Sequence, residues 1–233
     1  MNYLDKNTMY HSSTALNIEL PKKSYRFASI GDHASVLTDI YQEEVNLAIW
    51  KNELSHEIKK NVENIVQELV QLNVMLTSTP SQVVKHLVEF TPDLTKSNAF
   101  CEHIALLVDM FCTLFELKQV GLRLMIIDKA MCPKFHVDRV PCRLITTFSG
   151  VATEWIPHHK VDRSKLGASS SGIPDDKSGI LQNPEDIQRL ITGDIALLKG
   201  EGWYNNENCG AVHRSPAISK NEKRLLLSLD FMD

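Results

Sequence analysis

Three side chains that together could bind a metal ion are spread over the C-terminal half of the chain. His136 and Asp138 stand two residues apart in segment 135–138, which is predicted to be extended, and His213 follows much later. Successive side chains of a strand point to opposite faces, so His136 and Asp138 would project from the same face. Two imidazoles and one carboxylate form the facial triad that holds non-haem Fe(II) and leaves positions open for substrate and oxygen. The pattern therefore predicts an open-sided metal site.

An arginine on the last predicted strand, 223–231, is placed to bind an anion near that metal. A guanidinium group is a planar fork of donors that matches a carboxylate, and Arg224 would supply it. Arg224 and Ser228 share one face of the strand, whereas the other face is entirely apolar and must contact the core. Lys199 and Arg214 are further cations available for the same role. The pattern predicts Arg224 and Ser228 as the anion-binding pair.

Further residues are candidates for contacts with a substrate or an anion: Arg143, Trp155, Lys199, Trp203 and Arg214. The tryptophans could line the entrance to the site, or they could pack in the core as aromatic residues usually do. Segment 162–183 is rich in Ser, Gly, Asp and Lys, which predicts a flexible insertion without core residues. Its position favours a lid over the site, with a plain linker as the alternative.

Composition excludes several classes of protein. The chain has 233 residues, of which 43% are hydrophobic and 23% charged, as in an ordinary soluble globular protein. A net charge of −4 gives no basic surface on which nucleic-acid binding could rest. There is no signal-peptide pattern and no run of roughly 20 apolar residues, so we expect a cytoplasmic protein without a membrane partner.

The cysteines predict free thiols rather than a second metal site. The five cysteines contain no CxxC pair, which is the spacing typical of zinc or redox sites. Cys101 and His103 stand two apart on a predicted helix and would point away from each other, so a structural role is expected for both.

Helical patterns precede strand patterns along the chain. Residues 1–30 are predicted to form an irregular N-terminal arm, 31–118 a helical support region, and 119–233 a region of strands. Helices are predicted over 53–72, 81–90 (with Ser81 as N-cap), 97–117 and 184–191 (with Asn183 as cap). Strands are predicted over 45–50, 120–128, 135–138, 142–148, 153–157, 193–200 and 223–231. This order predicts an α+β fold in which an antiparallel barrel or sandwich is backed by helices.

Residues 120–233 resemble the double-stranded β-helix of the Fe(II)/2-oxoglutarate-dependent oxygenases. The family's HxD pair, distal His and following Arg match His136-Val137-Asp138, His213 and Arg224, with an interval most like that of the phytanoyl-CoA hydroxylase branch. One feature departs from the pattern: Leu226 stands two residues beyond Arg224, where some members have the serine of an Arg-x-Ser pair. The resemblance implies a single domain, 1–233, whose C-terminal double-stranded β-helix (jelly-roll or cupin-like) is backed by N-terminal helices.

The whole chain resembles the bacterial domain-of-unknown-function family numbered 1826. Four segments carry this resemblance: Phe135–Asp138, Leu198–Glu201, Gly210–Pro216 and Arg224–Asp230. The family is linked to zinc homeostasis, so the resemblance leaves zinc open as the metal.

Together the resemblances imply an oxygenase that uses Fe(II) and 2-oxoglutarate to hydroxylate or demethylate an unidentified small-molecule or peptide substrate. An alternative is a non-catalytic, cupin-like metal-binding protein of zinc homeostasis, in which Arg224 is structural or binds another anion. In a third interpretation, His136 and His213 only satisfy hydrogen bonds in the core of a barrel.

Overall fold

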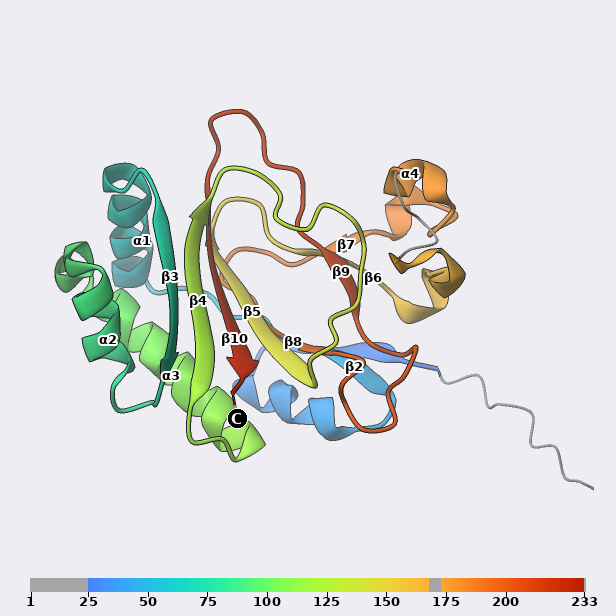
Figure 1. Ribbon diagram of the computed structural model, residues 1–233, viewed down its shortest axis with the longest axis horizontal. Helices are drawn as coiled ribbons and strands as arrows, with labels where there is room; N and C mark the ends of the chain where they lie inside the picture. Colours follow the sequence, from blue (N-terminus) through green and yellow to red (C-terminus); the bar gives the residue numbers. More distant parts are fainter. Residues whose placement is uncertain (1–24, 168–172, 233) are drawn as a thin grey trace, which may run out of the picture.

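Two β-sheets form the centre of the protein, and helices cover one side of the larger sheet (Figure 1). The computed structural model describes residues 25–167 and 173–232. The larger sheet contains, in spatial order, β1 (Phe27–Gly31), β2 (Val45–Trp50), β8 (Ile195–Lys199), β5 (Cys142–Ser149), β10 (Arg224–Phe231), β4 (Val120–Ile127) and β3 (Leu72–Ser78). The smaller sheet contains β7 (Gln188–Arg189), β6 (Glu154–Ile156) and β9 (Val212–Arg214). Neighbouring strands are antiparallel except β1 and β2, which are parallel.

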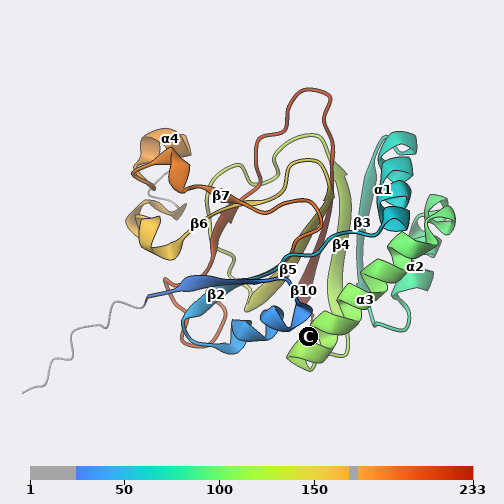
Figure 2. The same cartoon turned by 180° about the vertical axis from the view of Figure 1, so that it is seen from behind.

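Three α-helices pack on the outer face of the larger sheet and lie in front of it in Figure 2. They are α1 (His56–Glu68), α2 (Val83–Phe90) and α3 (Asn98–Phe115), and a short α4 (Asp175–Ser178) lies apart from them. The 3-10 helices are η1 (Ala34–Tyr41), η2 (Pro92–Lys96), η3 (His158–Lys160), η4 (Arg163–Lys165) and η6 (Pro184–Asp186). Helix α3 is long and apolar enough to cross a membrane, yet its residues Phe100, Ile104, Leu107 and Phe111 are buried in the core. It is therefore the core helix of this fold.

The alternation of β10 separates a packing face from a functional face. Leu225, Leu227 and Leu229 are fully buried against the helices, as the apolar face of this strand predicts. Arg224 and Ser228 lie on the inner face, which looks toward the smaller sheet. A second apolar cluster fills part of the space between the two sheets. The inner face of β10 is thus enclosed without being filled.

The larger sheet is not confined to the C-terminal region, which corrects two sequence predictions. Residues 27–30 were predicted to belong to the N-terminal arm and residue 31 to the helical support region, but 27–31 form β1, while residues 1–24 lie outside the described part of the chain. Residues 72–78 belong to the region predicted to be helical support, but they form edge strand β3. Leu72, Val74 and Leu76 alternate with polar or exposed residues there. An alternation of apolar and polar residues with a period of two is typical of a β-strand.

Several predicted boundaries also move. Helix α1 ends at Glu68 rather than residue 72, and α2 starts after Gln82, so Ser81 is not its N-cap. The helix predicted over 184–191 is only the turn η6 followed by β7; Asn183 does cap this turn, by accepting a hydrogen bond from the Glu185 N–H. Pro184 favours the first helical turn, but the helix does not continue, because Gln188 and Arg189 pair with β6 instead.

The described parts of segment 162–183 contain a core residue, which the sequence did not predict. Ile180 is 1% exposed and packs with Phe135, Ile156 and Val212 in a small apolar cluster beside the smaller sheet. Residues 168–172 of the predicted flexible insertion lie outside the described residues. All five cysteines are free, in agreement with the sequence prediction.

Candidate metal centre

An antiparallel bridge brings the two candidate imidazoles together from distant parts of the chain. His136 and His213 donate backbone hydrogen bonds to each other's carbonyl groups, both at 3.0 Å. Directly opposed residues of an antiparallel pair share a face, so the rings lie side by side with their centroids 4.5 Å apart. Segment 135–138 was predicted to be a strand, but it makes only this one bridge. His213 is held more firmly because β9 also pairs with β6.

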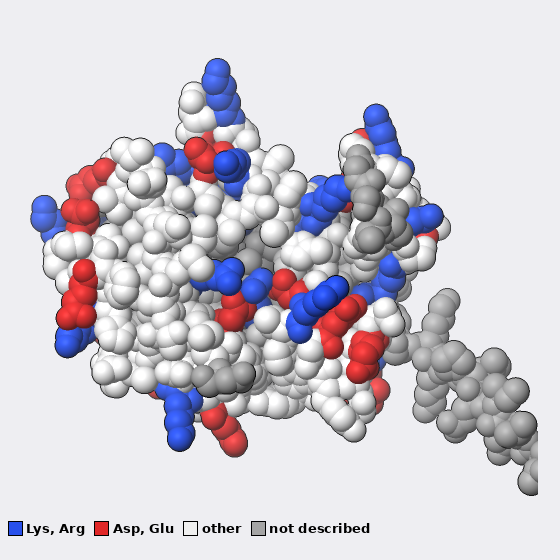
Figure 3. Space-filling model, in the orientation of Figure 1, with Lys and Arg blue, Asp and Glu red and all other residues white. Residues whose placement is uncertain are grey.

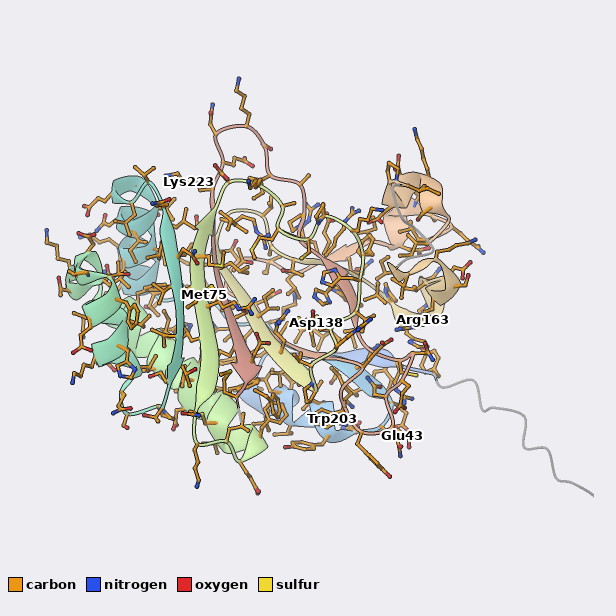
Figure 4. All side chains as sticks on the ribbon, in the orientation of Figure 1. Glu43, Met75, Asp138, Arg163, Trp203 and Lys223 are labelled. Carbon is orange, nitrogen blue, oxygen red and sulfur yellow. The ribbon has the colours of Figure 1, made fainter. Side chains whose placement is uncertain are left out.

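The three predicted ligands converge on one point. Asp138 Oδ1 lies 3.8 Å from His136 Nε2, and Asp138 Oδ2 lies 3.6 Å from His213 Nε2. All three ligand atoms are within 4.8 Å of one another. Figure 4 shows Asp138 in the middle of the molecule, between the larger sheet and β9. The sequence therefore identified three residues that the fold brings into ligand distance of a single ion.

Backbone carbonyl groups orient both imidazoles for metal binding. His136 Nδ1 lies 2.9 Å from the Lys134 carbonyl oxygen, and His213 Nδ1 lies 3.1 Å from that of Ala211. A carbonyl oxygen only accepts, so each Nδ1 carries the ring proton and each Nε2 keeps a lone pair directed toward Asp138. Burial lowers the pKa of His213 to about 4, against the attraction of Asp138, so this ring is neutral at pH 7. Neutral imidazole is the form that binds metals.

Arg143 fixes the position of the Asp138 carboxylate. Its Nη1 donates to Asp138 Oδ2 at 2.8 Å, while Nε and Nη2 donate to the two oxygens of Asp230 at 2.7 and 3.0 Å. Sequence patterns suggested Arg143 as a substrate or anion contact; here its guanidinium is already engaged by two carboxylates. Because one Asp138 oxygen is held this way, the carboxylate has a fixed orientation toward the imidazoles. The role of Asp230 had no signal in the sequence.

Arg224 is buried without a carboxylate partner. Its side chain is 1% exposed and donates only to hydroxyl groups, at 2.8 Å to Ser215, 3.3 Å to Thr147 and 3.5 Å to Thr153. Its Nε has no hydrogen-bond partner, and no acid in the described chain (25–167, 173–232) lies within ion-pair distance. Burial lowers the pKa of Arg224 to about 10, partly offset by a more distant Glu154.

Such a charge is costly to bury unless an anion completes its environment. The three hydroxyl groups had no signal in the sequence, because Thr147, Thr153 and Ser215 are assembled only by the fold.

One cavity of about 120 Å³ joins the imidazoles to Arg224. Ile145 and Leu226 give it an apolar wall; Ser215 lies beside Arg224, and Ser228 also lines the cavity. The two predicted histidine ligands and the predicted anion-binding pair therefore open into the same space. Arg214 also lines the cavity, but it is ion-paired with Glu154 and Asp175 at 2.7 and 2.9 Å.

Three of the sequence candidates lie outside this cavity. Lys199 belongs to the outer face of β8, where its Nζ donates to the Gln42 carbonyl at 2.9 Å and lies over the Trp203 ring. Burial lowers the pKa of Lys199 to about 8. Figure 4 places Trp203 well away from Asp138, below the sheet. Trp155 packs in the apolar cluster between the sheets and lines a different hollow. Strand alternation or packing directs these three side chains away from the cavity, and the tryptophans follow the packing alternative.

Comparison with known proteins adds a family to this geometry. The family model described as "Protein of unknown function (DUF1826)" matches residues 31–230. The chain belongs to the DUF1826 family. No curated protein matches the sequence.

Two solved structures are similar to this DUF1826 member over most of its length. One is the dioxygenase for auxin oxidation 1 from Arabidopsis thaliana, in a complex with 2-oxoglutarate (11% identity, 89% of this chain, 92% of that chain, TM-score 0.51). The other is the rice dioxygenase for auxin oxidation (11% identity, 89% and 83% coverage, TM-score 0.52). At this identity the likeness concerns the fold: a mixed α+β structure with a large sheet, similar to the double-stranded β-helix of 2-oxoglutarate oxygenases.

Proposed function

We propose that this protein is an Fe(II)/2-oxoglutarate-dependent oxygenase. The observation that carries the proposal is the buried, uncompensated Arg224 in the same cavity as the imidazoles of His136 and His213, which lie within ligand distance of Asp138. A metal site alone would explain His136, Asp138 and His213. Only an anionic ligand that reaches from the metal to the arginine explains all four residues together.

The residues fit this metal and cosubstrate. Two neutral imidazole nitrogens and one carboxylate oxygen are the donor set of non-haem Fe(II) oxygenases, and the open side of the triad faces the cavity. When bound, Fe(II) and 2-oxoglutarate supply the oxygen-activating chemistry, which belongs to the cofactors. Our assignment gives the metal to His136, Asp138 and His213, as the facial triad predicts.

The chain's own residues would orient the cosubstrate and keep water away from it. Arg224 would bind the carboxylate of 2-oxoglutarate that is remote from the metal, and the adjacent hydroxyl of Ser215 would help fix the guanidinium. Ser228 lines the same cavity but lies four positions along β10 from Arg224, opposite Arg123. Ile145 and Leu226 would cover the carbon chain, so the ion pair would form in a medium of low dielectric constant.

The fold similarity supports the proposal independently of the site. The Arabidopsis structure with a similar fold is a complex with 2-oxoglutarate, so this arrangement of sheets can accommodate that cosubstrate. A non-catalytic zinc protein, the alternative from sequence, needs no uncompensated arginine in its metal cavity. Hydroxylation or demethylation are the reactions we expect.

The experiment that tests the proposal measures 2-oxoglutarate binding to the Fe(II)-loaded protein under anaerobic conditions by calorimetry. We expect tight binding in the wild type, no binding without metal, and a Kd raised at least roughly tenfold in Arg224→Met. Lys60→Met, an exposed cation on α1, is the control and should bind as the wild type does. Equal affinities of wild type and Arg224→Met for 2-oxoglutarate would overturn the proposal.

A further inference from the structure

The inner face of strands β3 and β4 extends beyond the smaller sheet and is uncovered (Figure 1). Met75 on β3 is 58% exposed, and Arg123 on β4 is also exposed. Figure 3 shows a largely uncharged surface over this part of the sheet, with charged groups toward the middle of the molecule. Apolar side chains such as methionine stabilise a protein more when they are buried than when they face water. A sheet face that exposes methionines is therefore a candidate binding surface.

This face is continuous with the metal cavity. The cavity lined by His136 and His213 is also lined by Arg123, Met125 and Met131. A wider hollow of about 560 Å³ adjoins it, shares Arg123 in its lining, and includes Met75. A molecule lying over β3 and β4 could therefore place one end at the metal site.

The charges along this path leave one arginine at its outer end without a partner. Of the four arginines that line the metal cavity, Arg143 and Arg214 are each ion-paired with two carboxylates. Arg224 is assigned to the cosubstrate. The side chain of Arg123 has no hydrogen bond or ion pair among residues 25–167 and 173–232.

Arg123 also lies at a different position in the sheet from Arg224. Its Cα lies opposite that of Ser228, four positions along β10 from Arg224. At 3.4 Å per residue, this separates the two positions by roughly 13 Å along the sheet.

We propose that the substrate is a small organic acid with an apolar body, whose carboxylate pairs with Arg123 and whose apolar part lies on Met75, Met125 and Met131. This inference rests on the proposed function, since the metal cavity is where the far end of the substrate reacts. The flexible thioether side chains of methionine adapt to apolar ligands of varied shape. The anion at one end fixes which carbon atoms reach the metal.

The test uses the full chain labelled with ¹³C at the methionine methyl groups, titrated with hexanoate, octanoate and decanoate and with the matching neutral amides. No metal or 2-oxoglutarate is added. We expect the acids to shift the NMR signals of Met75, Met125 and Met131, but not that of Met110 on α3, on the opposite side of the sheet. In Arg123→Gln the Kd of the acids should rise roughly tenfold, whereas Lys60→Gln should bind as the wild type does. The amides should bind weakly to every variant.

Three outcomes would overturn the proposal. The first is that none of the acids shifts these signals. The second is that amides bind as tightly as acids. The third is that Arg224→Met, and not Arg123→Gln, removes the effect, which would place the carboxylate in the cosubstrate position. Because this titration needs no metal, its failure is distinct from failure of Fe(II)-dependent 2-oxoglutarate binding.

Discussion

Two arginines on adjacent strands of the larger sheet line the same cavity but have opposite surroundings. Arg143 on β5 is neutralised by Asp138 and Asp230, and although burial opposes its charge, these carboxylates raise its pKa. Arg224 on β10 contacts only hydroxyl groups, and burial lowers its pKa to about 10. The first charge is used within the protein to orient Asp138, which we propose as a metal ligand. The second remains available for a bound anion.

The different surroundings of the two arginines mean that removing each one should affect stability differently. Removing Arg143 would leave two partly buried carboxylates unpaired, which destabilises a folded protein. Removing Arg224 would leave only hydroxyl groups, which are easily satisfied by water. Substitution of Arg143 should therefore lower the stability of the protein. Substitution of Arg224 should instead weaken anion binding without lowering stability.

Asp138→Ala should have the largest effect. Loss of the only carboxylate of the triad should weaken Fe(II) binding by at least roughly 100-fold, because two imidazoles alone make a poor Fe(II) site. Metal stoichiometry after anaerobic loading and desalting measures this, with Asp109→Ala, an exposed carboxylate on α3, as control. Unchanged iron content in Asp138→Ala would show that Asp138 is not a metal ligand. The hydrogen bond from Arg143 to Asp138 would then have no role in metal binding.

Arg224→Met should lower affinity for 2-oxoglutarate by roughly 10- to 100-fold without lowering the free energy of unfolding. The substitution keeps the volume of the side chain and removes a buried charge that has no counter-ion. Calorimetry gives the affinity, and urea denaturation gives the stability. A clear loss of stability in this variant would assign Arg224 a structural role and remove the contrast with Arg143.

Arg143→Met should do the reverse, lowering the free energy of unfolding by roughly 2–3 kcal/mol because Asp138 and Asp230 lose their shared partner. The side chains involved are 20% and 13% exposed, so water screens the interaction only in part. Asp230→Asn in the same background should restore some stability, since one unpaired charge is removed. Full additivity of the two substitutions in urea denaturation would show that Arg143 and Asp230 do not act as a pair.

A smaller effect is expected from pH. Burial lowers the pKa of His213 to about 4, so the unfolded chain binds this proton more readily than the folded one between pH 6.5 and 4. Stability of the metal-free protein should therefore fall as pH falls through this window, by up to roughly 2 kcal/mol from His213 between pH 6.5 and 5. Denaturation curves at several pH values measure the slope. In His213→Asn the slope should be shallower, and an identical slope would contradict a buried neutral imidazole.

Local sequence patterns were sufficient to predict side-chain positions that depend on a single strand or on two neighbouring residues. The spacing of His136 and Asp138 predicted that their side chains come together, and the alternation of the last strand predicted that Arg224 and Ser228 face the same cavity. The pairing of distant segments was not predictable in this way. The shared role of Arg143 and Asp230 depends on the register between β5 and β10.

The position of Lys199 outside the cavity was unpredictable for the same reason. It follows Ile195 and Leu197 on the outer face of β8, and only the position of that strand in the sheet shows which face is outer. Strand β3 was missed because the helical pattern of α1 runs into its first residues without a glycine or proline to separate them.

The central claim is that one cavity holds Fe(II) and 2-oxoglutarate together, with Arg224 as the anchor of the latter. Its most direct test is anaerobic titration of the Fe(II)-loaded protein with 2-oxoglutarate, observing the weak visible charge-transfer band near ~500 nm that forms when both chelate at one open-sided site. We predict that the band appears in the wild type and that Arg224→Met requires much higher 2-oxoglutarate to produce it. Stoichiometric iron binding with no band at any 2-oxoglutarate concentration would contradict the account.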